Sequence, residues 1–137
     1  MSPEHPSGFI IGLGIDLVDL DEFDEILVRR GDAFIERVFT VDEKATCRSR
    51  HRPAQHFGAR FAAKEAAFKA LGTGWNEGVS WHDVEVVVAG PGTAPHLVLR
   101  GEFERRASAL GVDSSLVSLT HTRHYASAVV ALTRQVP

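Results

Sequence analysis

The alanine- and phenylalanine-rich segment 57–71 constrains the fold more than any other part of the chain. At about 100° per residue, its apolar side chains fall on two sides of a predicted helix, with phenylalanines on a narrow stripe and alanines on a broad opposite face. The two sides consist of Phe57, Phe61 and Phe68 and of Ala62, Ala63, Ala66, Ala67 and Ala70. A helix that is apolar around most of its circumference is normally buried, so the other elements must pack around this one.

Two charged residues, Glu65 and Lys69, lie one turn apart in the seam between these two sides. Buried Glu and Lys side chains are rare unless they are paired or hold a ligand. The pair is therefore either a structural ion pair or part of a chemical site.

The composition indicates one ordinary globular domain. The chain has 137 residues, of which 44% are hydrophobic and 24% are charged. A net charge of −3 argues against a dedicated nucleic-acid binder, which usually carries a basic field. The single cysteine, Cys47, excludes an internal disulfide, and its charged surroundings offer no activating partner.

The chain also lacks the signals of membrane insertion or export. No apolar run approaches the roughly 20 residues that a membrane helix needs. Residues 1–8 contain two prolines and no apolar stretch, so we expect a short tail rather than a signal peptide, followed by one domain over 9–137. These features predict a cytoplasmic protein with no membrane or nucleic-acid partner.

The pattern of helix and strand signals predicts an α+β fold, in which an antiparallel sheet packs against the long central helix. Phe9–Val18 is predicted to be a buried strand, and Asp19 to Phe39 a helix interrupted near Gly31. The remaining predicted elements are a helix that begins with the capping box Thr40–Glu43 and ends before Pro53, strands at 83–89 and 96–100, a helix at 102–110 closed by Gly111, and a hairpin of 115–120 with 125–132.

Two glycine pairs resemble phosphate-binding loops without matching one. Gly12 and Gly14 lack the third glycine of a dinucleotide-binding fingerprint, because Leu17 stands at its position. Gly72 and Gly74 follow a helix instead of preceding one, so the local pattern favours a C-terminal helix cap over a phosphate contact.

Asp16 is a charged residue inside an apolar strand, where aspartate is disfavoured. It either caps the end of the strand or forms a site. Carboxylates from two separate elements, completed by waters and phosphate oxygens, are a usual arrangement for Mg²⁺. Asp16 and Glu65 are therefore candidate metal ligands, and Lys69 is placed to neutralise phosphate charge. Among the seven histidines, His51 and His56 are expected on the surface, whereas His121 ends a strand.

Three motifs resemble the signature of the 4'-phosphopantetheinyl transferase superfamily, in its single-domain holo-acyl-carrier-protein synthase branch. The motifs are Gly14-Ile-Asp16, Arg60-Phe-Ala-Ala-Lys-Glu-Ala-Ala-Phe-Lys69 and Ser118-Leu-Thr-His-Thr122. The similarity extends from Ile10 to Leu132. It implies transfer of 4'-phosphopantetheine from coenzyme A to a serine of an apo acyl carrier protein, with release of 3',5'-ADP.

The resemblance also implies roles for individual residues. Asp16 and Glu65 match the Mg²⁺ ligands, with Mn²⁺ as a possible substitute, and Glu65 is our candidate for the base that activates the serine. Glu65, Lys69 and His121 are the predicted catalytic residues. The residues expected near coenzyme A are Arg60, Lys64, Lys69, Gly72, Gly74, Ser118 and His121.

The family forms homotrimers with sites between adjacent subunits, and its first helix is typically basic because carrier proteins are acidic. Arg29, Arg30 and Arg37 are the basic candidates here. Glu22 stands where relatives commonly place an arginine, within an acidic cluster at the start of the helix. The cluster either complements the positive helix N-terminus or alters carrier docking.

Two other functions are compatible with parts of this pattern. A non-catalytic module that binds coenzyme A or a carrier protein would keep the scaffold, and a Mg²⁺-dependent nucleotide hydrolase would use the same carboxylates. The sequence leaves open whether the carrier belongs to fatty-acid or polyketide synthesis.

Overall fold

The computed structural model describes residues 9–74, 77–90 and 92–135. The predicted tail at 1–8 lies outside these residues. The elements follow the order β1 (Phe9–Asp19), α1 (Leu20–Val38), α2 (Val41–Arg48), α3 (Pro53–Leu71), the 3₁₀ turn η1 (Trp81–Asp83), β2 (Val84–Val87), β3 (His96–Leu99), α4 (Gly101–Ala109), β4 (Ser114–His121) and β5 (Tyr125–Arg134). No helix in the described part of the chain is both long and apolar enough to cross a membrane.

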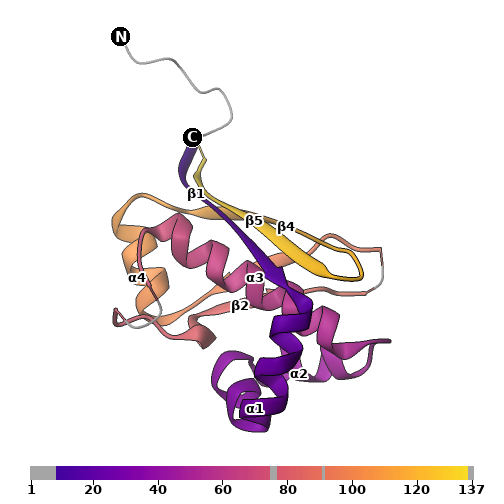
Figure 1. Ribbon diagram of the computed structural model, residues 1–137. Helices are drawn as coiled ribbons and strands as arrows, with labels where there is room; N and C mark the ends of the chain where they lie inside the picture. The colour runs from indigo at the N-terminus through magenta and orange to yellow at the C-terminus, as the bar shows by residue number, and fades with distance from the viewer. Residues whose placement is uncertain (1–8, 75–76, 91, 136–137) are drawn as a thin grey trace.

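The strands form two antiparallel sheets, which confirms the predicted α+β class. The larger sheet has the order β1-β5-β4, so β1 and β4 are its two edges, and β2 pairs with β3 in a separate hairpin. The helices lie on one side of the larger sheet, with α3 running beneath its strands (Figure 1).

The alanine face of α3 packs directly against the sheet. Ala62, Ala63, Ala66 and Ala67 are fully buried. A Cβ atom on Gly14 would come within 1.9 Å of the carbonyl oxygen of Ala66, and one on Gly12 within 2.0 Å of that of Ala70. The two glycines of β1 are therefore packing residues that let strand and helix backbones approach.

The phenylalanine stripe of α3 packs on the opposite side, against the other helices and η1. Phe57 contacts Phe39 with ring centroids 4.8 Å apart, and Phe61 contacts Phe23 of α1 at 5.5 Å. Phe68 lies 5.1 Å from Trp81. The two faces predicted from the helical period are thus both core faces.

The predicted helix signals are confirmed within α1, at the start of α2 and at the end of α3. Asp19 caps α1 by accepting from the Asp21 and Glu22 amides, and Gly31 interrupts the helix at φ 58°. The Thr40 capping box is complete, and Gly72 ends α3 in the left-handed conformation at φ 81°.

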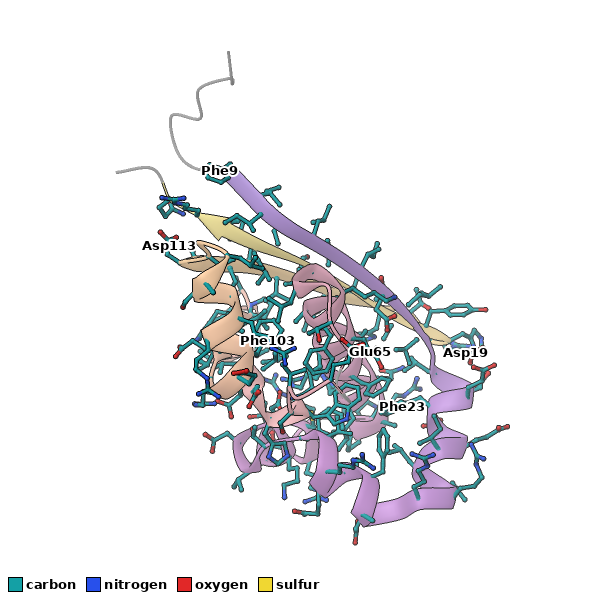
Figure 2. The ribbon with its side chains drawn as sticks, turned by 90° about the vertical axis from the view of Figure 1, so that its left-hand side faces the viewer. Phe9, Asp19, Phe23, Glu65, Phe103 and Asp113 are labelled. Atoms are coloured by element: carbon teal, nitrogen blue, oxygen red, sulfur yellow. The ribbon has the colours of Figure 1, made fainter. Side chains whose placement is uncertain are left out.

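The outer face of the larger sheet is exposed, contrary to the prediction that β1 is a buried strand. β1 was expected to be buried, but Leu13, Ile15 and Leu17 are 62–65% exposed, as is Leu116 of β4 at 66%. The register places Leu13 and Leu116 in one row across Ala131 of β5, so these side chains share a face. The helices cover only the other face (Figure 2), so β1 is half-exposed.

Candidate functional site

The first cluster joins β1 to α3 on the helix side of the sheet. Asp16 lies in β1 on the inner face, because its register partner Ala128 is buried against α3. The Lys69 ammonium lies 2.9 Å from Asp16 Oδ1 and donates a further hydrogen bond to the Ile15 carbonyl at 3.1 Å. Asp16 is therefore not a strand-end cap, and its carboxylate contacts Lys69.

Glu65 lies in the middle of α3 (Figure 2), close enough to Asp16 and Lys69 to feel both charges. Its carboxylate is partly buried and has no hydrogen-bond or ion-pair partner among residues 9–74, 77–90 and 92–135. Burial raises the pKa of Glu65, the negative charge of Asp16 raises it further, and Lys69 opposes the shift. An unpaired, partly buried carboxylate beside a second carboxylate is unfavourable by itself, and a cation would relieve it.

The donor chemistry of this cluster fits Mg²⁺ or Mn²⁺. Both ions prefer oxygen ligands, and Mg²⁺ usually keeps several waters while binding one or two carboxylates together with substrate phosphates. The described residues contain no group of three or more His, Cys, Asp or Glu that would form a complete protein metal site. Asp16 and Glu65 therefore suit an ion whose remaining ligands come from a phosphate-bearing substrate and water.

A second cluster, of basic side chains, lies at the N-terminal part of α3. The rings of His56 and His121 are 5.8 Å apart in an edge-on arrangement. Arg60 is buried; its Nη1 donates to the His56 carbonyl, while its Nε has no partner among the described residues. Burial lowers the pKa of His56, and the charges of Arg60, His121 and Arg50 lower it further. This arrangement favours an anion.

The prediction that His56 is a surface residue holds only in part, because its ring is half-buried and packs against His121. The spacing of His56 and Arg60, one helical turn apart on α3, was the signal that would have found it. His51 is exposed, as expected.

The two clusters lie at opposite edges of the sheet in one chain. Asp16 belongs to edge strand β1 and His121 to edge strand β4, with β5 between them. Two strand spacings separate their backbones by roughly 10 Å. The structure thus does not bring His121 to the carboxylates within one subunit. Ser118 is exposed and pairs with Val129 and Ile15 in a row on the outer face, away from α3.

The prediction that Lys64 lies near a phosphate is corrected by the structure. Its side chain is fully buried, and its ammonium lies 2.9 Å from the equally buried Glu43 carboxylate. It also donates to the carbonyls of Trp81 and Val84. With three protein partners and no exposure, Lys64 ties α3 to α2 and to the start of β2. Cys47 is likewise buried, and burial raises the pKa of its thiol to about 11.

Gly72 serves as the helix cap that the local sequence favoured. Its amide donates to the carbonyls of Phe68 and Lys69, and the Thr73 amide also donates to Phe68. These amides are already used, which argues against a phosphate contact through Gly72. Gly74 remains a prediction.

A cavity of about 240 Å³ lies between α1 and α3. Glu65 lines it together with three arginines and an apolar wall of α1, α3 and η1. The lining residues are Ile26, Arg29, Arg30, Phe34, Arg37, Val38, Phe61, Glu65 and Trp81. The structure therefore brings Arg29, Arg30 and Arg37 to the same hollow as the candidate metal ligand.

Paired carboxylates with an adjacent lysine at one edge of the sheet, and a basic cluster at the other edge, define a domain suited to binding and transferring a phosphate-bearing group. Comparison with known proteins supports this class of function. The profile of the 4'-phosphopantetheinyl transferase superfamily matches residues 12–130, and the chain belongs to this superfamily, as the sequence motifs indicated.

Individual relatives within this superfamily are named as acyl-carrier-protein synthases. A holo-[acyl-carrier-protein] synthase of Geobacter metallireducens is 42% identical over 125 residues, which cover 91% of this chain and 98% of the relative. The fold is similar to that of Plasmodium yoelii acyl carrier protein synthase with ADP bound, with TM-score 0.82, 26% identity and coverage of 93% and 98%. It is also similar to Helicobacter pylori holo-[acyl-carrier-protein] synthase in complex with coenzyme A, with TM-score 0.75, 27% identity and coverage of 88% and 98%.

Proposed function

We propose that this protein is a holo-acyl-carrier-protein synthase, which transfers 4'-phosphopantetheine from coenzyme A to a serine of an apo acyl carrier protein. The serine oxygen forms a bond to the β-phosphorus of coenzyme A, and the bond from that phosphorus to the bridging oxygen breaks. The products are holo carrier protein and 3',5'-ADP. The observation that carries the proposal is the grouping of Asp16, Glu65 and Lys69 in a chain that belongs to this superfamily.

Asp16 and Glu65 would hold Mg²⁺, or Mn²⁺ in its place. The ion would neutralise charge on the diphosphate of coenzyme A, which is the main requirement of phosphoryl transfer. Lys69 would contact the same diphosphate. Glu65, directly or through a water, would take the proton of the attacking serine; a carboxylate with a raised pKa is better suited to this role than an ordinary one.

Arg60 and His121, with His56 beside them, would bind another phosphate of coenzyme A. The buried, unpartnered Nε of Arg60 supports this role. Gly74 and Ser118 stay candidates for coenzyme A contact from the motif resemblance alone.

We further propose a homotrimer with active sites between adjacent subunits. Two observations support it: the apolar outer face of the sheet is exposed, and the two clusters lie at opposite edges of one chain. A large exposed apolar patch usually marks an interface. Leu13→Asp should yield monomers by sedimentation velocity, whereas Val28→Asp, at an exposed apolar residue on α1, should not. A Leu13→Asp variant that stays trimeric contradicts this assembly.

The carrier would dock on α1, since Arg29, Arg30 and Arg37 line the cavity that contains Glu65. Acidic residues on a carrier would pair with these arginines, so its serine would reach the carboxylates. Asp19 is occupied as the helix cap, but Glu22, Asp24 and Glu25 are exposed and would repel part of an acidic carrier. We place this reaction in the cytoplasm.

The test is a mass measurement on apo carrier proteins incubated with the protein, coenzyme A and Mg²⁺. We expect the carrier to gain the mass of phosphopantetheine, and Asp16→Asn and Glu65→Gln to abolish the gain. Glu36→Gln, at an exposed carboxylate of α1, is the matched control and should stay active. Binding of coenzyme A without any mass gain, across a panel of apo carriers, would favour a non-catalytic module instead. Phosphate or AMP release without a carrier would favour a hydrolase.

A further inference from the structure

The Lys69 ammonium occupies the position that a cation would take on Asp16. It contacts Asp16 Oδ1 at 2.9 Å and the Ile15 carbonyl at 3.1 Å, so both of its protein partners belong to β1. The Asp16 side chain is 16% exposed, and Lys69 covers the carboxylate from the side of α3.

Glu65 is left without such a partner although it lies one turn from Lys69 on the same helix. The cluster contains two carboxylates and one ammonium, and only Asp16 is neutralised by direct contact. A divalent cation is attracted to Glu65 but repelled by Lys69, and it reaches Asp16 only if Lys69 moves or shares the carboxylate.

The Lys69 side chain is 55% exposed, so it is free to exchange partners without disturbing the core. A phosphate-bearing ligand at this site offers the ammonium oxygens that replace Asp16. The same ligand supplies the metal ligands that the two carboxylates lack.

We infer that Lys69 couples metal binding to coenzyme A binding: it occludes Asp16 in the free protein and transfers to the diphosphate when coenzyme A binds. This inference rests on the proposed function. Metal and coenzyme A then bind with positive coupling, for which a factor of about 5–150 is typical of linked sites. Lys69 acts here as a positioning residue that controls access to a metal ligand.

The test measures Mn²⁺ affinity by electron paramagnetic resonance of free Mn²⁺, with and without coenzyme A, in wild type and in Lys69→Met. Mn²⁺ with coenzyme A alone gives the correction for metal bound by the ligand itself. We expect Lys69→Met to bind Mn²⁺ about 5–150-fold more tightly than wild type in the absence of coenzyme A, and to lose most of the coupling. Lys69→Gln should behave in the same way, and Lys44→Met, which removes a lysine of α2 that pairs with Glu36, should match wild type.

Equal or weaker Mn²⁺ binding by both Lys69 variants, in proteins with a wild-type circular dichroism spectrum, overturns the inference. Asp16→Asn and Glu65→Gln separate this failure from that of the proposed function. If both weaken Mn²⁺ binding while the Lys69 variants leave it unchanged, only the coupling is refuted. If neither weakens it in any state, the metal assignment and the coupling fail together.

Discussion

Replacing Lys64 with methionine tests whether a residue of the signature motif acts in stability or in substrate binding. Lys64 is fully buried and contacts the buried Glu43 carboxylate and two backbone carbonyls. Burial lowers the pKa of Lys64, and the neighbouring Glu43 carboxylate opposes this shift. Methionine fills a similar volume but leaves the Glu43 charge without its partner.

The expected loss of stability follows from that unpaired charge. Removing one partner of a buried ion pair typically costs about 3–5 kcal/mol. Glu43 keeps the amides of Thr40 and Val86 as donors at 2.9 and 2.8 Å, which limits the loss, while the Val84 carbonyl loses its lysine donor. We therefore expect a loss of about 4 kcal/mol in the free energy of unfolding, a large part of the roughly 5–15 kcal/mol typical of a domain.

Urea unfolding at one fixed protein concentration measures this loss, since assembly makes stability depend on concentration. The double variant Glu43→Gln, Lys64→Met should lose less than Lys64→Met alone, because it removes the uncompensated charge while glutamine still accepts from both amides. Lys44→Met, which leaves its partner Glu36 exposed to solvent, should lose much less stability than Lys64→Met.

Calorimetry with coenzyme A gives the result that would refute the reasoning. We expect folded Lys64→Met to bind coenzyme A as wild type does. A variant with wild-type stability and a tenfold or greater loss of affinity for coenzyme A would show that Lys64 contacts the ligand after all.

Three further changes follow from the packing and the charges. Gly14→Ala should lower the free energy of unfolding by about 1–3 kcal/mol because its Cβ would meet a carbonyl of α3 at 1.9 Å. Gly90→Ala should not, since a Cβ there would meet no described residue beyond its chain neighbours within 4 Å. Equal urea midpoints for the two variants would contradict the close packing. Glu65→Gln should have a higher melting temperature than wild type at pH 7 in EDTA, because the raised pKa of Glu65 means that the folded protein disfavours its ionised form. This gain should vanish below about pH 4.5, where Glu65 is protonated in both the folded and the unfolded protein. The pKa of His56 is lowered, so the unfolded chain takes up its proton first as the pH falls through about 6.5. The fold loses stability over that range, and His56→Gln should flatten the loss in urea titrations at several pH values while His51→Gln leaves it unchanged.

The apolar period of α3 and the capping signals could be predicted from sequence because they are local. Helical geometry fixes which side chains share a face, and a capping box or a glycine after a helix acts within a few residues. Asp16, Glu65 and Lys69 were chosen for the same reason, since charges within apolar elements stand out in the sequence.

The role of Lys64 could not be read from the same helix. Lys64 and Lys69 stand in one motif, but the long-range packing of Glu43 and η1 buries the first and leaves the second at the site. His121 was grouped with the carboxylates from its motif, whereas sheet order places it across β5 from Asp16.

The sequence by itself determined most of the elements, the superfamily and which charged residues stand out, because periodicity, capping and motif spacing are properties of neighbouring residues. Only the tertiary structure decided which of those charges are buried and paired, which glycines are needed for close packing, and which face of the sheet lies open. Each of these depends on contacts between residues far apart in the chain. Glu65 is the clearest case. The sequence indicated an unusual residue because a glutamate lies within an apolar helix, and the tertiary structure places its carboxylate near Asp16 without an ion-pair partner among the described residues.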